Sequence, residues 1–121
     1  MKVKKVKVEM YSFEIRLIIG TKSDIESRLK KERPKFSMGR GLTKAIKGRC
    51  GYEIYINTES KKSILAIFTH ELIHVVDRTS AAIGAEDERE LRAYLAGFLW
   101  QKFESMLLEA ETQRKIKEKE G

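Results

Sequence analysis

The segment SILAIFTHELIHVV, residues 63–76, holds both histidines of the chain within an otherwise apolar run. Apolar residues on both sides predict a largely buried helix over about residues 60–79. On a helix, His70 and His74 lie on one face about one turn apart, so both imidazoles can reach one ion. Glu71 then lies about 100° around the helix from His70, where it can approach a water on that ion without being a ligand.

A metal ion would explain why these polar residues interrupt an apolar helix, because a buried imidazole or carboxylate without a partner is costly. His-Glu-x-x-His is the arrangement of zinc metallopeptidases. We therefore predict His70 and His74 as metal ligands. The alternative is that both histidines are ordinary core residues.

Length and composition limit the class of protein. The 121 residues predict one domain, residues 1–121, with a single small core. The sequence has no apolar run long enough to span a membrane, and its basic start lacks the apolar region of a signal peptide. The single cysteine, Cys50, excludes an internal disulfide framework and favours a reducing compartment. We expect a cytoplasmic protein without membrane contact.

The positive charge is concentrated in the first half. Residues 1–50 contain 15 Lys and Arg against 5 Asp and Glu, whereas residues 51–121 contain 10 against 13. Such asymmetry can mark a surface for nucleic acid or an acidic partner, or simply a solvated basic face. No recognisable nucleic-acid-binding motif accompanies it.

The first half predicts one strand and one helix. Apolar and polar residues alternate over residues 2–19, as they do in a strand. The apolar residues change from even to odd positions near Met10 and Tyr11. We therefore expect a bulge or break there, or a strand that begins at about residue 10. Ser23, with Glu26 three residues later, resembles a capping box that opens a helix over about residues 24–32.

The middle of the chain is the least regular. Pro34 should stop the preceding helix. Residues 33–50 favour a loop because of their glycines and charges, with a short strand or hairpin as the alternative. Residues 51–57 predict a strand, after which Thr58 or Ser60 caps the histidine helix.

A second long helix is predicted from about residue 86, on apolar residues at three-four spacing. Residues 112–121 are mostly charged and are expected to form a flexible tail. The order of strand, helix, strands, helix, helix predicts an α+β fold with helices packed on one small sheet.

A catalytic zinc site needs three protein ligands and one open position. With no third histidine, the third ligand must be a carboxylate or Cys50. Glu90 is favoured because Leu91 and Leu95 border it and would place it toward the interior. The alternatives are Glu86, Glu88 and Asp77, and all the acids near residue 90 could instead complement a helix N-terminus.

Asp77 lies three residues after His74, on the same helix face. Its expected role is to accept the spare N–H of a histidine and fix the tautomer of that ring. The alternatives are metal ligation and a salt bridge with Arg78 or Arg92.

The segment THELIH, residues 69–74, followed by Glu90-x-x-Ala93, resembles the gluzincin group of zinc metallopeptidases. The resemblance covers about residues 50–107, and the short chain is similar to minigluzincins and to small metallopeptidases encoded by phages and prophages. It implies a small zincin-like domain: a short mixed sheet with an edge strand, a backing helix, an active-site helix and a glutamate helix. Tyr94 stands where many members have Asp, which gives Asp77 more weight.

The resemblance implies Zn²⁺-dependent hydrolysis of peptide bonds in a protein or peptide substrate, with Glu71 as general base. Residues 51–57 resemble the edge strand that pairs with an extended substrate. The location would be the host cytoplasm if a phage encodes the chain. The alternative function is a non-catalytic zinc-containing protein that contacts nucleic acid or an acidic partner through residues 1–50.

Two further expectations concern the surroundings of the site. Oxyanion support has four candidates: Tyr52, Tyr55, Tyr94 and Arg92. Cys50 is expected to be an inert buried thiol rather than a residue that blocks the zinc in a latent form.

Overall fold

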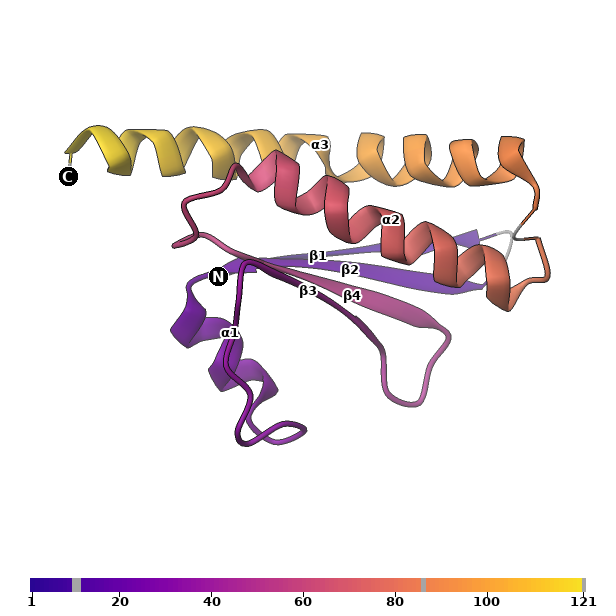
Figure 1. Ribbon diagram of the computed structural model, residues 1–121, viewed down its shortest axis with the longest axis horizontal. Coiled ribbons are helices and arrows are strands. Elements are labelled where there is room, and N and C mark those ends of the chain that lie inside the picture. The colour runs from indigo at the N-terminus through magenta and orange to yellow at the C-terminus, as the bar shows by residue number, and fades with distance from the viewer. Residues whose placement is uncertain (10–11, 86, 121) are drawn as a thin grey trace.

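A mixed β-sheet forms the centre of the computed structural model, which describes residues 1–9, 12–85 and 87–120 (Figure 1). Within these residues the elements are β1 (Lys2–Val8), β2 (Phe13–Gly20), α1 (Lys22–Leu29), β3 (Gly41–Ala45), β4 (Gly51–Asn57), α2 (Ile64–Ala82) and α3 (Arg89–Glu120). The predicted α+β class is confirmed. None of these helices combines the length and apolarity needed to cross a membrane.

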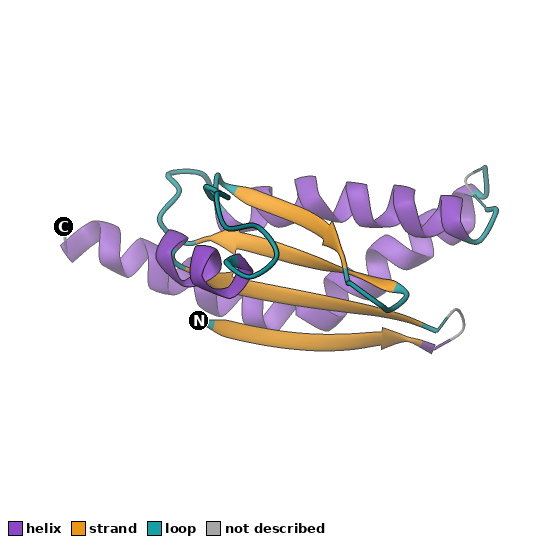
Figure 2. Ribbon diagram, turned by 90° about the horizontal axis from the view of Figure 1, so that it is seen from below, coloured by secondary structure: helices purple, strands orange, loops and turns teal. Residues whose placement is uncertain are grey.

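The described strands form one sheet in the order β1-β2-β4-β3, so β1 and β3 are its edges (Figure 2). β1 pairs antiparallel with β2, and β3 pairs antiparallel with β4. β2 and β4 run parallel in the middle, joined by a connection that contains α1 and β3. The two sheet edges are therefore formed by different hairpins.

The helices cover the two faces of the sheet unequally. α2 and α3 lie side by side on one face, and α1 lies on the other (Figure 1). Because side chains alternate along a strand, Leu17 and Ile54 point into the larger core beneath α2 and α3. Ile18 and Tyr55 point the other way, into a smaller cluster with Ile25 of α1. This explains why β2 and β4 are almost continuously buried.

The prediction of one strand over residues 2–19 is wrong, because this segment is a hairpin of β1 and β2. The change in apolar parity marks a reversal of the chain: Val8 and Phe13 are partners across the hairpin and belong to the same core. Met10 and Tyr11, where a bulge or break was expected, lie outside the described residues.

The predicted helix after the first sheet segment begins earlier than expected. Thr21 is the N-cap of α1 and forms a capping box with Asp24: the Thr21 hydroxyl accepts from the Asp24 amide, and the Asp24 carboxylate accepts from the Thr21 amide. The predicted pair of Ser23 and Glu26 is wrong, because Ser23 already lies inside the helix. α1 ends at Leu29, ahead of Pro34.

The prediction of a loop over residues 33–50 is wrong for residues 41–45, which form β3 and confirm the alternative of a short strand or hairpin. A turn containing Gly48, at φ 76°, returns the chain into β4. The strand predicted at residues 51–57 is confirmed as β4, but it lies inside the sheet. The expectation that it serves as an edge strand is therefore wrong, and β3 has that place.

The histidine helix is capped by Ser63, whose hydroxyl accepts a hydrogen bond from the Ala66 amide, rather than by Thr58 or Ser60. The carboxylate of Glu111, from α3, accepts bonds from the Ser63 hydroxyl (2.6 Å) and the Ile64 amide (3.4 Å). Residues 112–120, expected to be a tail, continue α3 as helix.

Candidate metal centre

The helix α2 presents its two histidines to solvent. The centroids of the His70 and His74 rings lie 5.1 Å apart with their planes at 77°. The His70 side chain is 66% exposed, and His74 is also exposed. The alternative of two core histidines is therefore wrong. Two imidazoles this close on one face of a helix form a donor pair that an ion in solution can reach.

Glu71 lies on the inward-facing side of the same helix turn and is only 7% exposed. Its Oε1 accepts a hydrogen bond from the Thr43 hydroxyl of β3 at 2.8 Å. Its Oε2 lies 4.0 Å from His70 Nε2. One carboxylate oxygen is thus held by the sheet, while the other lies on the histidine side.

The edge strand β3 contacts α2 closely because it carries glycine at position 41. A Cβ at Gly41 would lie 2.7 Å from Ile67 Cγ2 and 3.0 Å from Glu71 Oε2. Farther along α2, Arg78 Nη1 donates to the Thr43 carbonyl at 3.3 Å. Steric fit at Gly41 and hydrogen bonds at Thr43 together fix the position of Glu71.

The pairing of β3 shows which of its backbone groups face outward. Asn57 N donates to Arg40 O at 2.9 Å, and Ile46 N donates to Gly51 O at 3.1 Å. Since backbone groups alternate in direction along an antiparallel strand, those of Gly41, Thr43 and Ala45 face the free edge of the sheet. These three positions, which the sequence did not single out, form the sheet edge beside α2.

The structure does not bring Glu90 to the histidines. Arg92 of α3 forms an ion pair with Asp77 of α2, so the Arg92 side of α3 faces α2 at this level. Glu90 is two residues earlier, about 200° around the helix, and points away from α2. Its side chain is exposed. The ligand role of Glu90 stays a prediction, which this placement of its side chain does not support.

The other proposed ligands are also elsewhere. Asp77 is paired with Arg92, which is the salt-bridge alternative rather than the expected bond to a histidine. Glu88 is exposed just before α3, and Glu86 lies outside the described residues. Within residues 1–9, 12–85 and 87–120, no group of three or more His, Cys, Asp and Glu side chains is arranged to hold a metal. The donor pair fits a metal ion, but a set of three protein ligands is not complete.

Most of the four oxyanion candidates have other partners. The Tyr55 hydroxyl donates to Glu53 at 2.9 Å, on the sheet face away from α2. Tyr52 stacks on Phe13, and Tyr94 stacks on Phe98. Arg92, through its ion pair with α2, is the candidate that lies within about one turn of His74. These contacts favour packing roles for the tyrosines.

Cys50, expected to be buried, is exposed in the turn between β3 and β4. Its carbonyl accepts the Glu14 amide at 3.1 Å. The exposure follows from the β3–β4 hairpin, because Cys50 lies in the turn that joins its two strands.

Some of the basic residues in the first half of the chain form ion pairs with a buried carboxylate. Buried Glu53 accepts from Lys44 Nζ at 3.2 Å and from the Tyr55 hydroxyl, with Arg16 and Arg28 at 3.4 and 3.5 Å. Burial alone would raise the pKa of Glu53, but the hydrogen bonds from Tyr55 and Lys44 and the nearby cations outweigh it and lower that pKa. Burial, with Glu53 adjacent, raises the pKa of Tyr55 to about 12.

Comparison with known proteins gives no match to a family model, to a curated protein or to a solved structure.

Proposed function

We propose that this chain is a zinc-dependent peptidase in which His70 and His74 bind the metal and Glu71 is the general base. The observation that supports it most is the placement of the Glu71 carboxylate. Thr43 holds one oxygen, and the other lies beside His70 on a helix turn that exposes both imidazoles. A purely structural metal site has no need for a base fixed in this position.

The residues of the chain have separate tasks in this proposal. Zinc, when bound, supplies the Lewis acidity that makes water a nucleophile near neutral pH. Glu71 accepts the proton that the attacking water loses and passes it to the leaving amine. Thr43 positions Glu71, because its hydroxyl occupies Oε1 and leaves Oε2 for the proton transfer.

The substrate would align along the free edge of β3. The outward backbone groups of Gly41 and Ala45 can pair with an extended peptide, as strands do when they add to a sheet. The Thr43 carbonyl is already bonded to Arg78, so the substrate pairs on either side of it or displaces that guanidinium. This assigns to β3 the role that the sequence assigned to residues 51–57.

Two histidines are fewer ligands than catalytic zinc sites have. In the proposal, solvent and substrate complete the coordination, and the third-ligand role of Glu90 stays a prediction. A site with two protein ligands should bind zinc more weakly than one with three.

The decisive experiment combines metal binding with hydrolysis. Zinc affinity is measured by competition with a chromophoric chelator, and cleavage is followed by mass spectrometry on a mixture of unstructured peptides. Glu71→Gln should retain zinc and lose about 10²-fold or more of the cleavage rate, because a general base contributes about that much. Glu104→Gln, an exposed change on α3, is the control. Full cleavage by Glu71→Gln would disprove the proposal.

The incomplete ligand set favours a second candidate, a non-catalytic zinc-containing binding protein. It predicts that the wild-type chain binds zinc and cleaves none of the peptides. The contact of residues 1–50 with nucleic acid or an acidic partner stays a prediction within this second candidate.

A further inference from the structure

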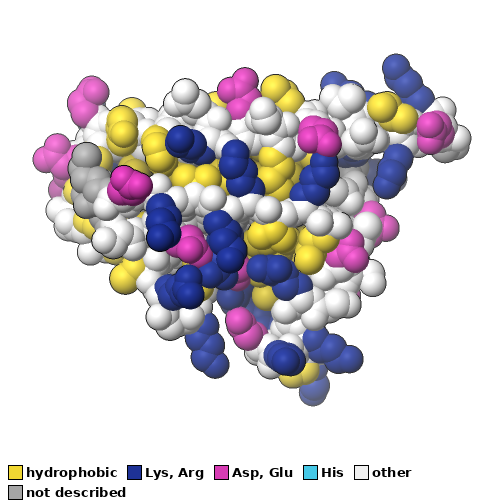
Figure 3. Space-filling view, turned by 180° about the vertical axis from the view of Figure 1, so that it is seen from behind, with side chains coloured by type: hydrophobic (Ala, Val, Ile, Leu, Met, Phe, Trp, Pro, Cys, Tyr) yellow, Lys and Arg dark blue, Asp and Glu magenta, His cyan; other side chains and the backbone are white. Residues whose placement is uncertain are grey.

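A groove of about 680 Å³ lies between β1 and α3, at the sheet edge opposite β3. Its walls are residues 4–9 on one side and Tyr94, Phe98 and Lys102 on the other. Figure 3 looks onto this side of the molecule: Lys and Arg side chains gather across it, and hydrophobic side chains show between them beneath α3. The groove is far from the histidines in the fold, because α2 packs over β3 and β4.

The strand β1 has a free backbone edge along this groove. Glu14 N donates to Cys50 O at 3.1 Å, and Thr58 N donates to Gly20 O at 2.9 Å, so the even residues of β2 face β4. By alternation the odd residues of β2 face β1, and their partners in β1 are even-numbered. The backbone N–H and C=O groups of Val3, Lys5 and Lys7 therefore face outward.

The α3 side of the groove is aromatic. Tyr94 and Phe98, one turn apart, stack with ring centroids 6.0 Å apart and planes at 20°. Tyr94 is 56% exposed, so a partner can reach its ring. Lys102 Nζ lies 5.5 Å from the centroid of the Phe98 ring. The backbone carbonyl of Lys102 accepts a hydrogen bond from Lys4 Nζ at 2.6 Å. The last contact joins β1 to α3 across the groove.

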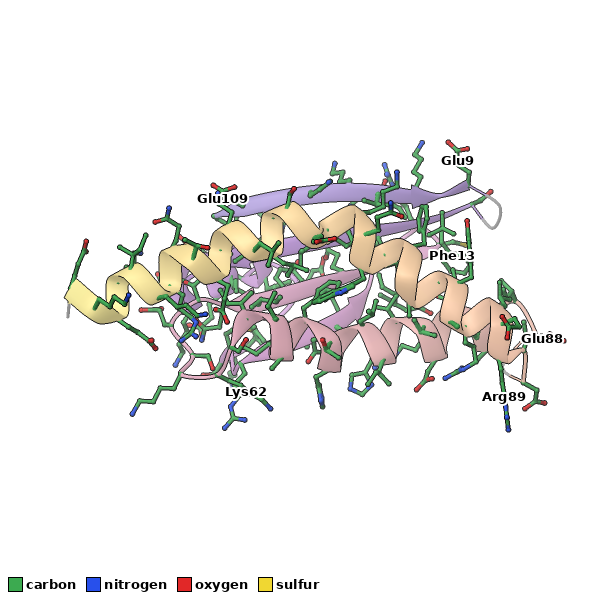
Figure 4. All side chains as sticks on the ribbon, turned by 90° about the horizontal axis from the view of Figure 1, so that it is seen from above. Glu9, Phe13, Lys62, Glu88, Arg89 and Glu109 are labelled. Carbon is green, nitrogen blue, oxygen red and sulfur yellow. The ribbon has the colours of Figure 1, made fainter. Side chains whose placement is uncertain are left out.

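Two lysines at this edge, Lys5 and Lys7, are available for a partner. Lys2 forms an ion pair with Glu109, whereas Lys5 and Lys7 form none with the acidic residues that the structure describes. Nitrogen-tipped side chains project along β1 between the labelled Glu109 and Glu9 (Figure 4). Two copies of β1 would bring like charges together, which disfavours pairing with a second copy. The charge instead suits an acidic partner.

We propose that β1 and this groove bind an extended acidic segment of another protein as an added strand. The segment pairs with the outward backbone groups of Val3, Lys5 and Lys7. Its side chains alternate, so acidic residues on one face meet Lys5 and Lys7, while apolar residues on the other enter the groove against Tyr94 and Phe98. This inference is independent of the proposed peptidase function.

A single-stranded nucleic acid could also use lysines and stacked aromatic rings. It would leave the row of outward N–H and C=O groups on β1 unpaired. The free strand edge therefore favours a peptide, and nucleic acid is an outcome that the experiment distinguishes.

The probe is a fluorescein-labelled peptide, EVEFEVE, which alternates acidic and apolar residues. VVFEEEE has the same composition without alternation, and a labelled oligo-dT represents nucleic acid. Fluorescence anisotropy gives affinities, and amide chemical shifts locate the site. Lys5→Pro removes an outward N–H without breaking the ladder to β2, and Lys5→Gln is the matched control that removes only the charge.

EVEFEVE should bind at least about tenfold more tightly than VVFEEEE and should shift the amides of Val3, Lys5 and Lys7. Lys5→Pro should weaken binding more than Lys5→Gln does. The double variant Tyr94→Ala with Phe98→Ala should weaken binding about tenfold. Leu108→Ala, an exposed apolar control, should leave the affinity unchanged. The proposal would be overturned by equal affinity for the two peptides or by full binding to Lys5→Pro. It would also be overturned if oligo-dT bound more tightly in a way that depends on Tyr94, or if EVEFEVE did not bind at all.

Discussion

The Thr43 hydroxyl of the edge strand β3 donates to the Glu71 carboxylate of the histidine helix at 2.8 Å, across the contact that Gly41 permits. This bond joins the sheet edge to the residue proposed as general base. It also satisfies a carboxylate oxygen that is nearly inaccessible to water, which makes it measurable through stability as well as through activity.

Replacing Thr43 with Val should destabilise the protein by about 1–3 kcal/mol, because the shape is kept and a buried carboxylate oxygen loses its donor. Thr43→Ser keeps the hydroxyl and should recover most of that loss. Urea unfolding at neutral pH gives both values. Equal stability of the Val and Ser variants would mean that the hydrogen bond contributes nothing.

Gly41→Ala should cost about 1–3 kcal/mol, because the added Cβ would push β3 away from Ile67 and Glu71. Gly39→Ala is the matched control, since a Cβ there meets no atom within 4 Å. Thermal unfolding of the two variants compares them directly. A control variant as unstable as Gly41→Ala would attribute the loss to the loop rather than to the contact.

Glu111→Ala should destabilise the protein by about 1–3 kcal/mol, because Glu111 accepts from the Ser63 hydroxyl and the Ile64 amide at the start of α2. Glu104→Ala, an exposed residue on the same helix, should have little effect. Hydrogen exchange of the first turn of α2 should accelerate in the first variant alone.

Stability should depend on pH through Glu53 and Glu111. Burial raises the pKa of each carboxyl group, but hydrogen bonds outweigh it. The main donors are Tyr55 and Lys44 to Glu53, and Arg114 and Ser63 to Glu111. In the folded protein the pKa of each group is therefore lowered from the ordinary value of 4.5. A lowered folded pKa contributes stability that is present above the unfolded value and lost as pH falls through the folded one. Urea unfolding should therefore show stability declining below about pH 4.5, and less steeply in Glu53→Gln.

Zinc binding should depend on the histidines and not on Glu90. His70→Ala or His74→Ala should weaken zinc binding at least about tenfold, because each removes one of two ligands. Glu90→Gln should leave the affinity unchanged, since Glu90 lies on the side of α3 that points away from α2. Chelator competition measures all three. A large loss in Glu90→Gln would support the gluzincin ligand set and show that the start of α3 rearranges around the metal.

The elements that depend on local pattern could be predicted from the sequence. β4 was predicted with its bounds, and α2 within a few residues, because apolar periodicity and turn residues agree there. For β3 a loop was favoured over a short strand, because Gly41 and Lys44 are poor strand formers. Lys44 is nevertheless buried against Glu53, and Gly41 packs on α2, so distant residues stabilise this strand.

The part of the candidate site that depends on local sequence could also be predicted. The motif identified His70, Glu71 and His74, which lie within one helix turn whatever the rest of the chain does. Glu90 depended on how α3 is rotated against α2, and that rotation is set by contacts such as Arg92 with Asp77, which spacing alone does not determine. Thr43 left no signal in the sequence apart from its place in a segment where a hairpin was only the alternative to a loop.

One helix holds the histidine helix at both of its ends. Arg92 of α3 binds Asp77 near the end of α2, and Glu111 of α3 caps its beginning through Ser63. A force or ligand that tilts α3 must therefore carry the histidines with it. The last turns of α3 also provide Arg114, the cation that neutralises Glu111. Shortening the chain at residue 112 would remove Arg114 and leave the charge of Glu111 without its cation at the start of α2, so the charged C-terminal turns help to hold the histidine helix in place.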